Sequence, residues 1–301
     1  MTAGERATLH HIDPLAPHGH DPLVTVGKHD STCEAGVMVT HTEHFCLHRR
    51  GHRMEITHWL RPEQLDNNLA GLLADELFAP GWLSGVEVFE RVFTEVVQSV
   101  VDDPLRAWTT FYDNTLGRIR ECWARPAGCA PHSSIADFAP LYQRVLQVAP
   151  PGRVLDLGSC FGFLPLLLAE RGEHSVIASD LAPGSMRLLE VVAASRGHRM
   201  HTLVCDAAQV PLPDGAVDTV TAMHLLEHLE PARGDAVLAE ALRLARRRVI
   251  IAVPFEDRPN AAFGHVRTFT AADLDHLGAS TGHRYEVTHH HGGWLDLLKA
   301  P

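Results

Sequence analysis

From about residue 150 onward, short apolar runs alternate with segments of helical periodicity, and this alternation restricts the possible fold more than any other feature. The runs are continuously apolar over several residues, which is typical of strands covered on both faces. They are residues 154–157, 175–178, 202–204, 218–222 and 248–253. Strands that alternate with helices predict a parallel, doubly wound α/β sheet.

The first half of the chain has a different pattern. Residues 1–30 are rich in Pro, His, Gly and Asp and predict a loose arm. Residues 36–60 predict strands, with a turn at 49–52. We therefore expect an N-terminal α+β region over 1–130, with a substrate-selecting, lid or oligomer-forming role, and a catalytic domain over 131–301.

Helices are expected between these strands and the second half. Pro62 can open a helix that carries leucines at helical spacing, namely Leu65, Leu69, Leu72, Leu73 and Leu77. Ser84 with Glu87 resembles a capping box for the next helix, and Pro104 can begin a third. A break rich in Pro, Gly and Cys over 125–131 precedes a helix from about 134 to 148.

Bulk properties narrow the function and the location. The formal net charge of −11 argues against a large phosphate-binding surface and so against a nucleic-acid partner. No apolar run approaches the roughly 20 residues that a membrane span needs, and no secretory signal is evident. None of the six cysteines forms a C-x-x-C pair, so we expect free thiols and a cytoplasmic location. The oligomeric state is left open.

Polar and glycine residues follow the first three predicted strands of the second half. The first strand runs into Asp156-Leu157-Gly158-Ser159-Cys160-Phe161-Gly162, where glycines allow a sharp turn and close approach to a ligand. The second strand ends at Asp180, whose carboxylate can accept hydrogen bonds from two ribose hydroxyls. Asp206 and Ala207 follow the third strand, where an acceptor can meet an adenine amino group. Ligands bind at this edge of open α/β sheets.

The stretch 154–162 resembles the first motif of class I S-adenosylmethionine-dependent methyltransferases. The resemblance implies S-adenosylmethionine as cofactor, with Asp156 and Gly158 near its methionine end, Asp180 on the ribose and Asp206 near the adenine. Ser159, Cys160, Gly162, Leu181, Ala207 and His224 complete the expected cofactor site. The implied fold is a Rossmann-like, seven-stranded, mostly parallel sheet with one antiparallel strand from the terminal hairpin at 285–298. Cys160 departs from the family, which usually has a second glycine there.

A narrower resemblance involves both halves of the chain. The segments 48–52, 80–85 and 155–163 are similar to the mycofactocin oligosaccharide methyltransferases. That family implies methylation of a glucose hydroxyl on a peptide-derived redox cofactor. Two other readings stay open, an NAD-binding protein and a non-catalytic protein that kept the fold. The turn lacks the G-x-G-x-x-G of NAD proteins, which weighs against the first.

Candidate catalytic residues follow the fourth and fifth strands. Removal of a proton from an acceptor alcohol calls for a general base, and histidine suits this near neutral pH. His224, Glu227 and His228 follow the fourth strand, and His265 follows the fifth. On a helix, His224 and His228 would share a face, with Glu227 beside His224. Each histidine could instead have a structural role, and an N- or C-methyltransferase would need no such base.

Metal ligands and sugar-stacking aromatics are the remaining kinds of candidate residue. No convincing set of acids and histidines for a metal emerges from the sequence, so no metal is expected. Trp82 and Trp108 can stack on a sugar, although buried packing is the more common outcome. The expected partner is a small molecule or an oligosaccharide-bearing substrate.

Overall fold

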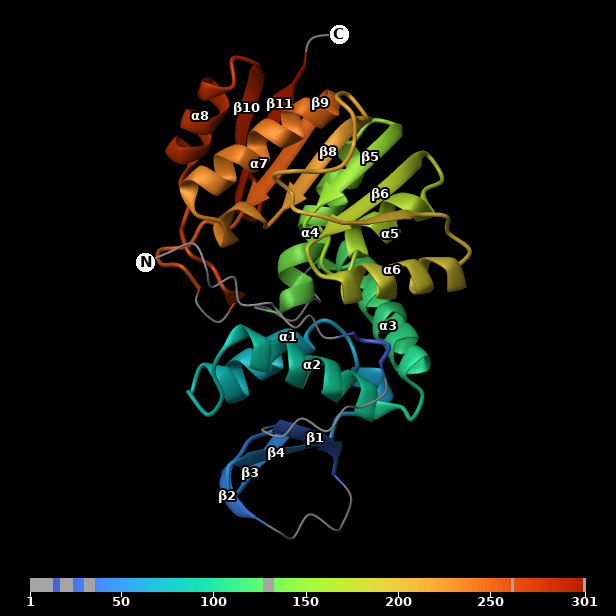
Figure 1. Ribbon diagram of the computed structural model, residues 1–301, viewed down its shortest axis with the longest axis vertical. Helices are drawn as coiled ribbons and strands as arrows, with labels where there is room; N and C mark the ends of the chain where they lie inside the picture. The colour runs from blue at the N-terminus through green and yellow to red at the C-terminus, as the bar shows by residue number, and fades with distance from the viewer. Residues whose placement is uncertain (1–12, 17–23, 30–35, 127–132, 261–262, 300–301) are drawn as a thin grey trace.

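The computed structural model describes residues 13–16, 24–29, 36–126, 133–260 and 263–299 (Figure 1). The second half folds around a seven-stranded sheet of order β10-β11-β9-β8-β5-β6-β7. Its strands are β5 (Gly152–Leu157), β6 (His174–Asp180), β7 (His201–Val204), β8 (Val217–Met223), β9 (Ala245–Val253), β10 (Arg284–His289) and β11 (Gly293–Leu298). β11 alone runs antiparallel to the other six strands of this sheet. The predicted Rossmann-like fold with one antiparallel strand is confirmed.

Alternate residues of the central strands face two separate helical layers. Val154 packs in a cluster with α4 (Ser134–Val148) and α5 (Phe163–Glu170). Its neighbour Leu155 packs in another cluster with α7 (Pro231–Leu244) and α8 (Ala271–Ser280). Since side chains alternate along a strand, continuous apolar runs fill both layers. The remaining helix, α6 (Pro183–Ser195), follows β6.

A smaller sheet of order β1-β4-β3-β2 lies at the other end of the molecule (Figure 1). Its strands are β1 (Val24–Lys28), β2 (Val37–His41), β3 (Phe45–Arg50) and β4 (Arg53–His58). The hairpin between β3 and β4 confirms the turn predicted at 49–52. The prediction of a loose arm over 1–30 is wrong for Val24–Lys28, because this segment forms β1 and pairs in parallel with β4. Residues 1–12 and 17–23 lie outside the described chain.

The helices of the first half differ in part from prediction. They are the short turn η1 (Pro62–Gln64), α1 (Leu69–Leu73), the π-helical turn η2 (Ala74–Phe78), α2 (Val86–Val100) and α3 (Pro104–Ala124). The helix predicted from Pro62 through Leu77 is interrupted, because the Asn68 N–H donates to the Asp66 side chain. The capping box of Ser84 is wrong, since Gly85, at φ +96°, precedes α2.

The start of α3 at Pro104 and the helix at 134–148 are confirmed. Arg125 ends α3, and residues 127–131 of the predicted break lie outside the described chain. Cys122 is disulfide-bonded, which corrects the expectation of free thiols, whereas Cys46, Cys160 and Cys205 are free.

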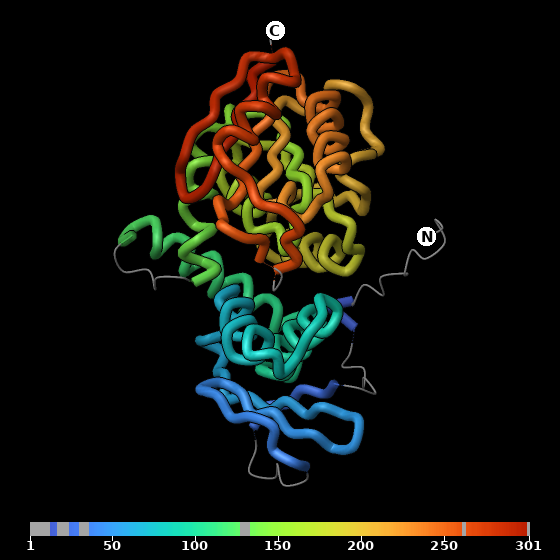
Figure 2. The backbone as a smooth tube through the Cα atoms, turned by 90° about the vertical axis from the view of Figure 1, so that its left-hand side faces the viewer, coloured from blue at the N-terminus to red at the C-terminus, as the bar shows by residue number. Residues whose placement is uncertain are grey.

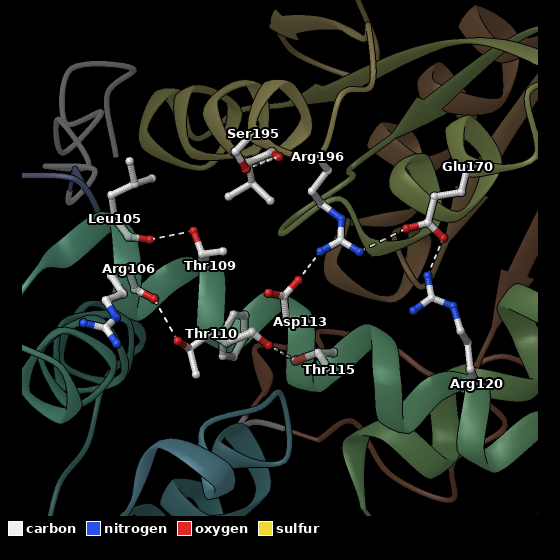
Figure 3. Close-up of polar contacts among 12 residues, drawn as sticks. Leu105, Arg106, Thr109, Thr110, Asp113, Thr115, Arg120, Glu170, Ser195 and Arg196 are labelled. Carbon is white, nitrogen blue, oxygen red and sulfur yellow. Dashed lines mark hydrogen bonds and ion pairs between the residues drawn. The ribbon is translucent and has the colours of Figure 1, made fainter.

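One hydrophobic cluster joins the N-terminal helices to the α/β domain. It contains residues of α2 and α3 together with Phe163 of α5 and Leu189 of α6. Figure 2 shows α1 and α2 between the small sheet and the α/β domain. Two ion pairs cross this interface: Arg196, after α6, contacts Asp113 of α3, and Arg120 of α3 contacts Glu170 of α5 (Figure 3). The predicted boundary near residue 130 falls in the stretch 127–132, so the division at that point stays a prediction.

Across the described ranges, no helix combines the length and the apolar character that crossing a bilayer requires.

Candidate active site

The turn after β5 is left-handed at three positions. Gly158, Cys160 and Gly162 have φ values of +68°, +51° and +72°. A Cβ added to Gly158 would lie 2.9 Å from the Leu225 side chain, and one added to Gly162 would lie 2.4 Å from Leu189. Both glycines are therefore required by backbone conformation and by space.

Cys160 occupies a left-handed position that favours glycine. Such a backbone costs an ordinary residue roughly 1–2 kcal/mol. The Cys160 N–H donates to Asp180 Oδ2 at 2.9 Å, which holds the residue in this conformation. The departure from glycine is thus accommodated without opening the turn.

Asp180 stands at the end of β6, beside the turn. Its Oδ1 accepts from the Ala182 N–H at 2.9 Å, and Oδ2 accepts from Cys160. Each carboxylate oxygen keeps a further lone pair, and the residue is only half-buried. The next residue, Leu181, is 58% exposed, so an apolar surface adjoins the carboxylate. These features fit a ribose with its base against Leu181.

Asp156 is buried beneath the turn. Thr221 Oγ1 donates to its carboxylate at 2.5 Å, and the Ser159 and Ser179 hydroxyls donate to its backbone carbonyl. Burial raises the pKa of Asp156 to about 6. The carboxylate braces the turn against β8, and its predicted contact with the methionine end stays a prediction.

Asp206 and Ala207 lie beyond the end of β7. The Asp206 side chain forms an ion pair with Arg233 of α7 and accepts from the Ala208 N–H. The Cys205 N–H donates to the Asp180 carbonyl at 3.0 Å, which ties this segment to the end of β6. The acids after β6 and β7 thus face one edge of the sheet, but Asp206 must share its carboxylate between Arg233 and any adenine.

His224 and Glu227 follow β8 and are largely buried. His224 has a φ of +53° and precedes the short helical turn η4 (Leu226–His228), so the predicted helical face with His228 is wrong. Its ring packs on Phe138 with centroids 4.9 Å apart, and burial lowers its pKa to about 3. The Glu227 side chain is fully buried, and burial raises its pKa to about 8. His224 Nδ1 lies 3.5 Å from Glu227 Oε1.

His228 and His265 meet at the same edge. Their rings are 4.8 Å apart and nearly perpendicular. His265 Nδ1 lies 2.7 Å from Glu256 Oε2, and His228 Nδ1 lies 3.3 Å from the Gly264 carbonyl oxygen. Of the four predicted catalytic residues, Glu227, His228 and His265 have side-chain nitrogen or oxygen atoms within 4.8 Å of one another.

Two parts of the site were not predicted. Glu256 follows β9 at the edge where ligands bind, and its position after that strand was the available signal. Phe161, within the turn, packs its ring 5.3 Å from Phe93 and 5.7 Å from Trp108 of the N-terminal helices. No local pattern shows that these helices cover the turn.

Known proteins resemble part of this chain. Residues 154–248 match the family model of a methyltransferase domain. Demethylmenaquinone methyltransferase of Thermus thermophilus is 34% identical over 131 residues, which is 42% of this chain and 59% of that protein. Malonyl-[acyl-carrier protein] O-methyltransferase of Serratia marcescens is 36% identical over 97 residues, 32% of this chain and 35% of that protein. Ajmaline N-methyltransferase of Rauvolfia serpentina is 29% identical over 97 residues, 32% of this chain and 33% of that protein.

The chain spans about a third to three fifths of the length of these curated relatives. Among solved structures, magnesium protoporphyrin IX methyltransferase of Synechocystis with bound SAH is similar with a TM-score of 0.45 and 19% identity, covering 63% of this chain and 98% of that one. A SAM-dependent methyltransferase from Aquifex aeolicus gives a TM-score of 0.44 and 17% identity, covering 61% of this chain and 96% of that one.

Proposed function

We propose that the chain is a class I S-adenosylmethionine-dependent methyltransferase that transfers the methyl group of S-adenosylmethionine to a small-molecule acceptor. The match of residues 154–248 to the model of a methyltransferase domain supports this proposal. The observation that carries this proposal is the Asp180 carboxylate, which two backbone amides hold beside the glycine turn. A carboxylate with free lone pairs at this edge can bind both ribose hydroxyls and orient the nucleoside.

We propose an oxygen acceptor. Methyl transfer to an alcohol requires that a general base remove the hydroxyl proton. Transfer to a neutral amine needs no base before the nitrogen attacks. The neighbouring side chains Glu227, His228 and His265, with Glu256 bonded to His265, form a polar cluster at the edge where the acceptor is expected. We assign activation of the hydroxyl to this cluster. The relatives' names include both an O- and an N-methyltransferase, so they do not select the atom.

The N-terminal region is proposed to select the acceptor. A Cβ added to Gly264 would lie 3.8 Å from His228 Nδ1 and 3.9 Å from Val86 of α2, so α2 begins beside the cluster. Trp82, just before α2, is 43% exposed and can stack on a sugar ring. Trp108 cannot, because it is fully buried and donates to the Pro14 carbonyl.

A sugar hydroxyl is the acceptor that this arrangement supports best. The glucose hydroxyl of a mycofactocin oligosaccharide is the specific candidate, on the resemblance of 48–52, 80–85 and 155–163 to that family. The test is incubation with S-adenosylmethionine carrying a deuterated methyl group, a panel of glycosylated acceptors, and matched amines. Mass spectra should show the label on a sugar oxygen. Label on nitrogen or carbon would contradict the oxygen acceptor, and cofactor binding without transfer to any acceptor would support a binding protein.

A further inference from the structure

Glu227, His228 and His265 converge although they come from two separate loops. One potential ligand atom from each lies within 4.8 Å of those of the other two. Glu227 and His228 follow β8, and His265 follows β9, so the two adjacent strands bring them together. The sequence alone indicated no metal set, because this convergence depends on the path of the loop after β9.

Both histidines have one ring nitrogen bonded to an oxygen. His265 Nδ1 is 2.7 Å from Glu256 Oε2, and His228 Nδ1 is 3.3 Å from the Gly264 carbonyl oxygen. A carbonyl oxygen can only accept, so His228 carries its proton on Nδ1. The Glu256 carboxylate likewise accepts from His265 Nδ1. The Nε2 lone pair of each ring is then available. Histidines that bind metals typically donate their other N–H to a carboxylate or a backbone carbonyl in this way.

The Glu227 carboxyl group supplies a second, independent observation. Its side chain is 0% exposed, and neither of its oxygens has a hydrogen-bond partner within the described part of the chain. Burying a carboxyl group without a partner is costly. His224 Nδ1 lies 3.5 Å from Glu227 Oε1 without forming a hydrogen bond, and Arg267 acts on Glu227 only electrostatically. A bound cation would satisfy the carboxylate oxygens.

We propose that Glu227, His228 and His265 bind one divalent transition-metal ion, with Glu256 orienting the His265 ring. Two imidazoles and one carboxylate suit borderline ions such as Zn²⁺ and Co²⁺. Three protein ligands leave coordination positions open for a substrate oxygen, as in catalytic rather than structural sites.

The role of the ion rests on the proposed methyl transfer. The ion binds the acceptor hydroxyl and lowers its pKa, and the proton passes to water. An electron pair of the oxygen forms the bond to the methyl carbon. The carbon–sulfur bond breaks, and its electron pair returns to sulfur, which becomes a neutral thioether. His265 is then a metal ligand rather than the free base expected from the sequence.

The test is titration of the metal-free chain, residues 1–301, with Co²⁺, followed by calorimetry and by the visible absorption of the ion. One site should bind more tightly than the background from the many other histidines. The variants Glu227→Gln and His228→Ala should raise the Kd of that site at least about tenfold, and Glu256→Gln should raise it about 10–100-fold without removing a ligand. The exposed His276→Ala on α8 is the matched control and should leave the Kd unchanged.

Equal Kd values for Glu227→Gln, Glu256→Gln and the unaltered chain would overturn the metal site. A separate titration with S-adenosylmethionine distinguishes this result from failure of the proposed function. Cofactor binding and methyl transfer that persist undiminished after metal removal would leave the methyltransferase proposal standing and overturn the metal inference. Tight Co²⁺ binding without cofactor binding would support the site and contradict the methyl transfer.

Discussion

The Tyr112 hydroxyl donates a 2.6 Å hydrogen bond to the carbonyl oxygen of Phe161. This bond runs from α3 of the N-terminal region to the glycine turn that follows β5. The N-terminal helices therefore hold the turn in position in addition to covering it.

Replacement of Tyr112 by Phe should lower stability and weaken cofactor binding. The change leaves the partly buried Phe161 carbonyl without this donor, at a cost of about 0.5–1.5 kcal/mol in the free energy of unfolding. Denaturant titration measures this cost, and calorimetry should show a several-fold higher Kd for S-adenosylmethionine. Tyr285→Phe is the control, because its hydroxyl bonds Asp275 at the surface. Equal losses in both variants would refute a special role for the α3 contact.

Gly162→Ala should be far more damaging than Gly172→Ala. Both glycines are left-handed, with φ of +72° and +70°, so the backbone cost is the same for both. Only at Gly162 would the added Cβ meet a neighbour, at 2.4 Å from Leu189, whereas nothing lies within 4 Å at Gly172. We expect an additional loss of about 1–3 kcal/mol from overpacking. Similar denaturation midpoints for the two variants would show that the Leu189 side chain moves aside without loss of stability.

His58 should make a pH-dependent contribution to the free energy of unfolding. Burial lowers its pKa to about 4, and its ring bonds Ser99 Oγ and the Leu60 N–H in the neutral form. In the unfolded chain, the His58 side chain has the ordinary histidine pKa of about 6.5. The contribution of His58 is therefore present above pH 6.5 and is lost as the pH falls toward 4, with a slope of up to about 1.4 kcal/mol per pH unit.

His58→Asn should flatten the stability profile between pH 4 and 6.5. Denaturant titrations of both proteins across this window isolate the contribution, because the other groups are common to them. The exposed His276→Asn serves as the control and should follow the unaltered protein. Parallel profiles for His58→Asn and the unaltered protein would mean that His58 does not titrate as its burial predicts.

His265→Ala should reduce turnover and spare cofactor affinity. Its ring is held by Glu256 at 2.7 Å and belongs to the cluster assigned to hydroxyl activation. Loss of proton removal from the acceptor should lower kcat by about 10²–10⁴-fold. The Kd for S-adenosylmethionine should change by less than about twofold, since Asp180 and the turn are untouched. An unchanged kcat would remove His265 from the mechanism.

The α/β domain could be predicted from the sequence because its signals are local. Continuous apolar runs around Val154 and Ile177 indicate strands covered on both sides. Asp156, Asp180 and Asp206 lie at or just beyond the carboxyl ends of successive strands. The parallel sheet then places these acids at one edge without further information.

The remaining features depend on contacts between distant segments. Val24–Lys28 becomes a strand by pairing with β4, because its run of three β-branched residues is too short to indicate a strand by itself. The helix expected from Pro62 is broken where Asn67 N–H donates to Thr115, far along the chain. The pairing of Glu256 with His265 likewise arises from the fold of the loop after β9.

The central claim is tested most directly by calorimetric titration of S-adenosylmethionine into the unaltered chain and into Asp180→Ala. Two charge-assisted hydrogen bonds to the ribose are each worth about 1.5–3 kcal/mol. The variant should therefore show a Kd at least about a hundredfold higher, with its fold confirmed by circular dichroism. The same Kd for both proteins, or no binding by the folded unaltered chain, would contradict the account.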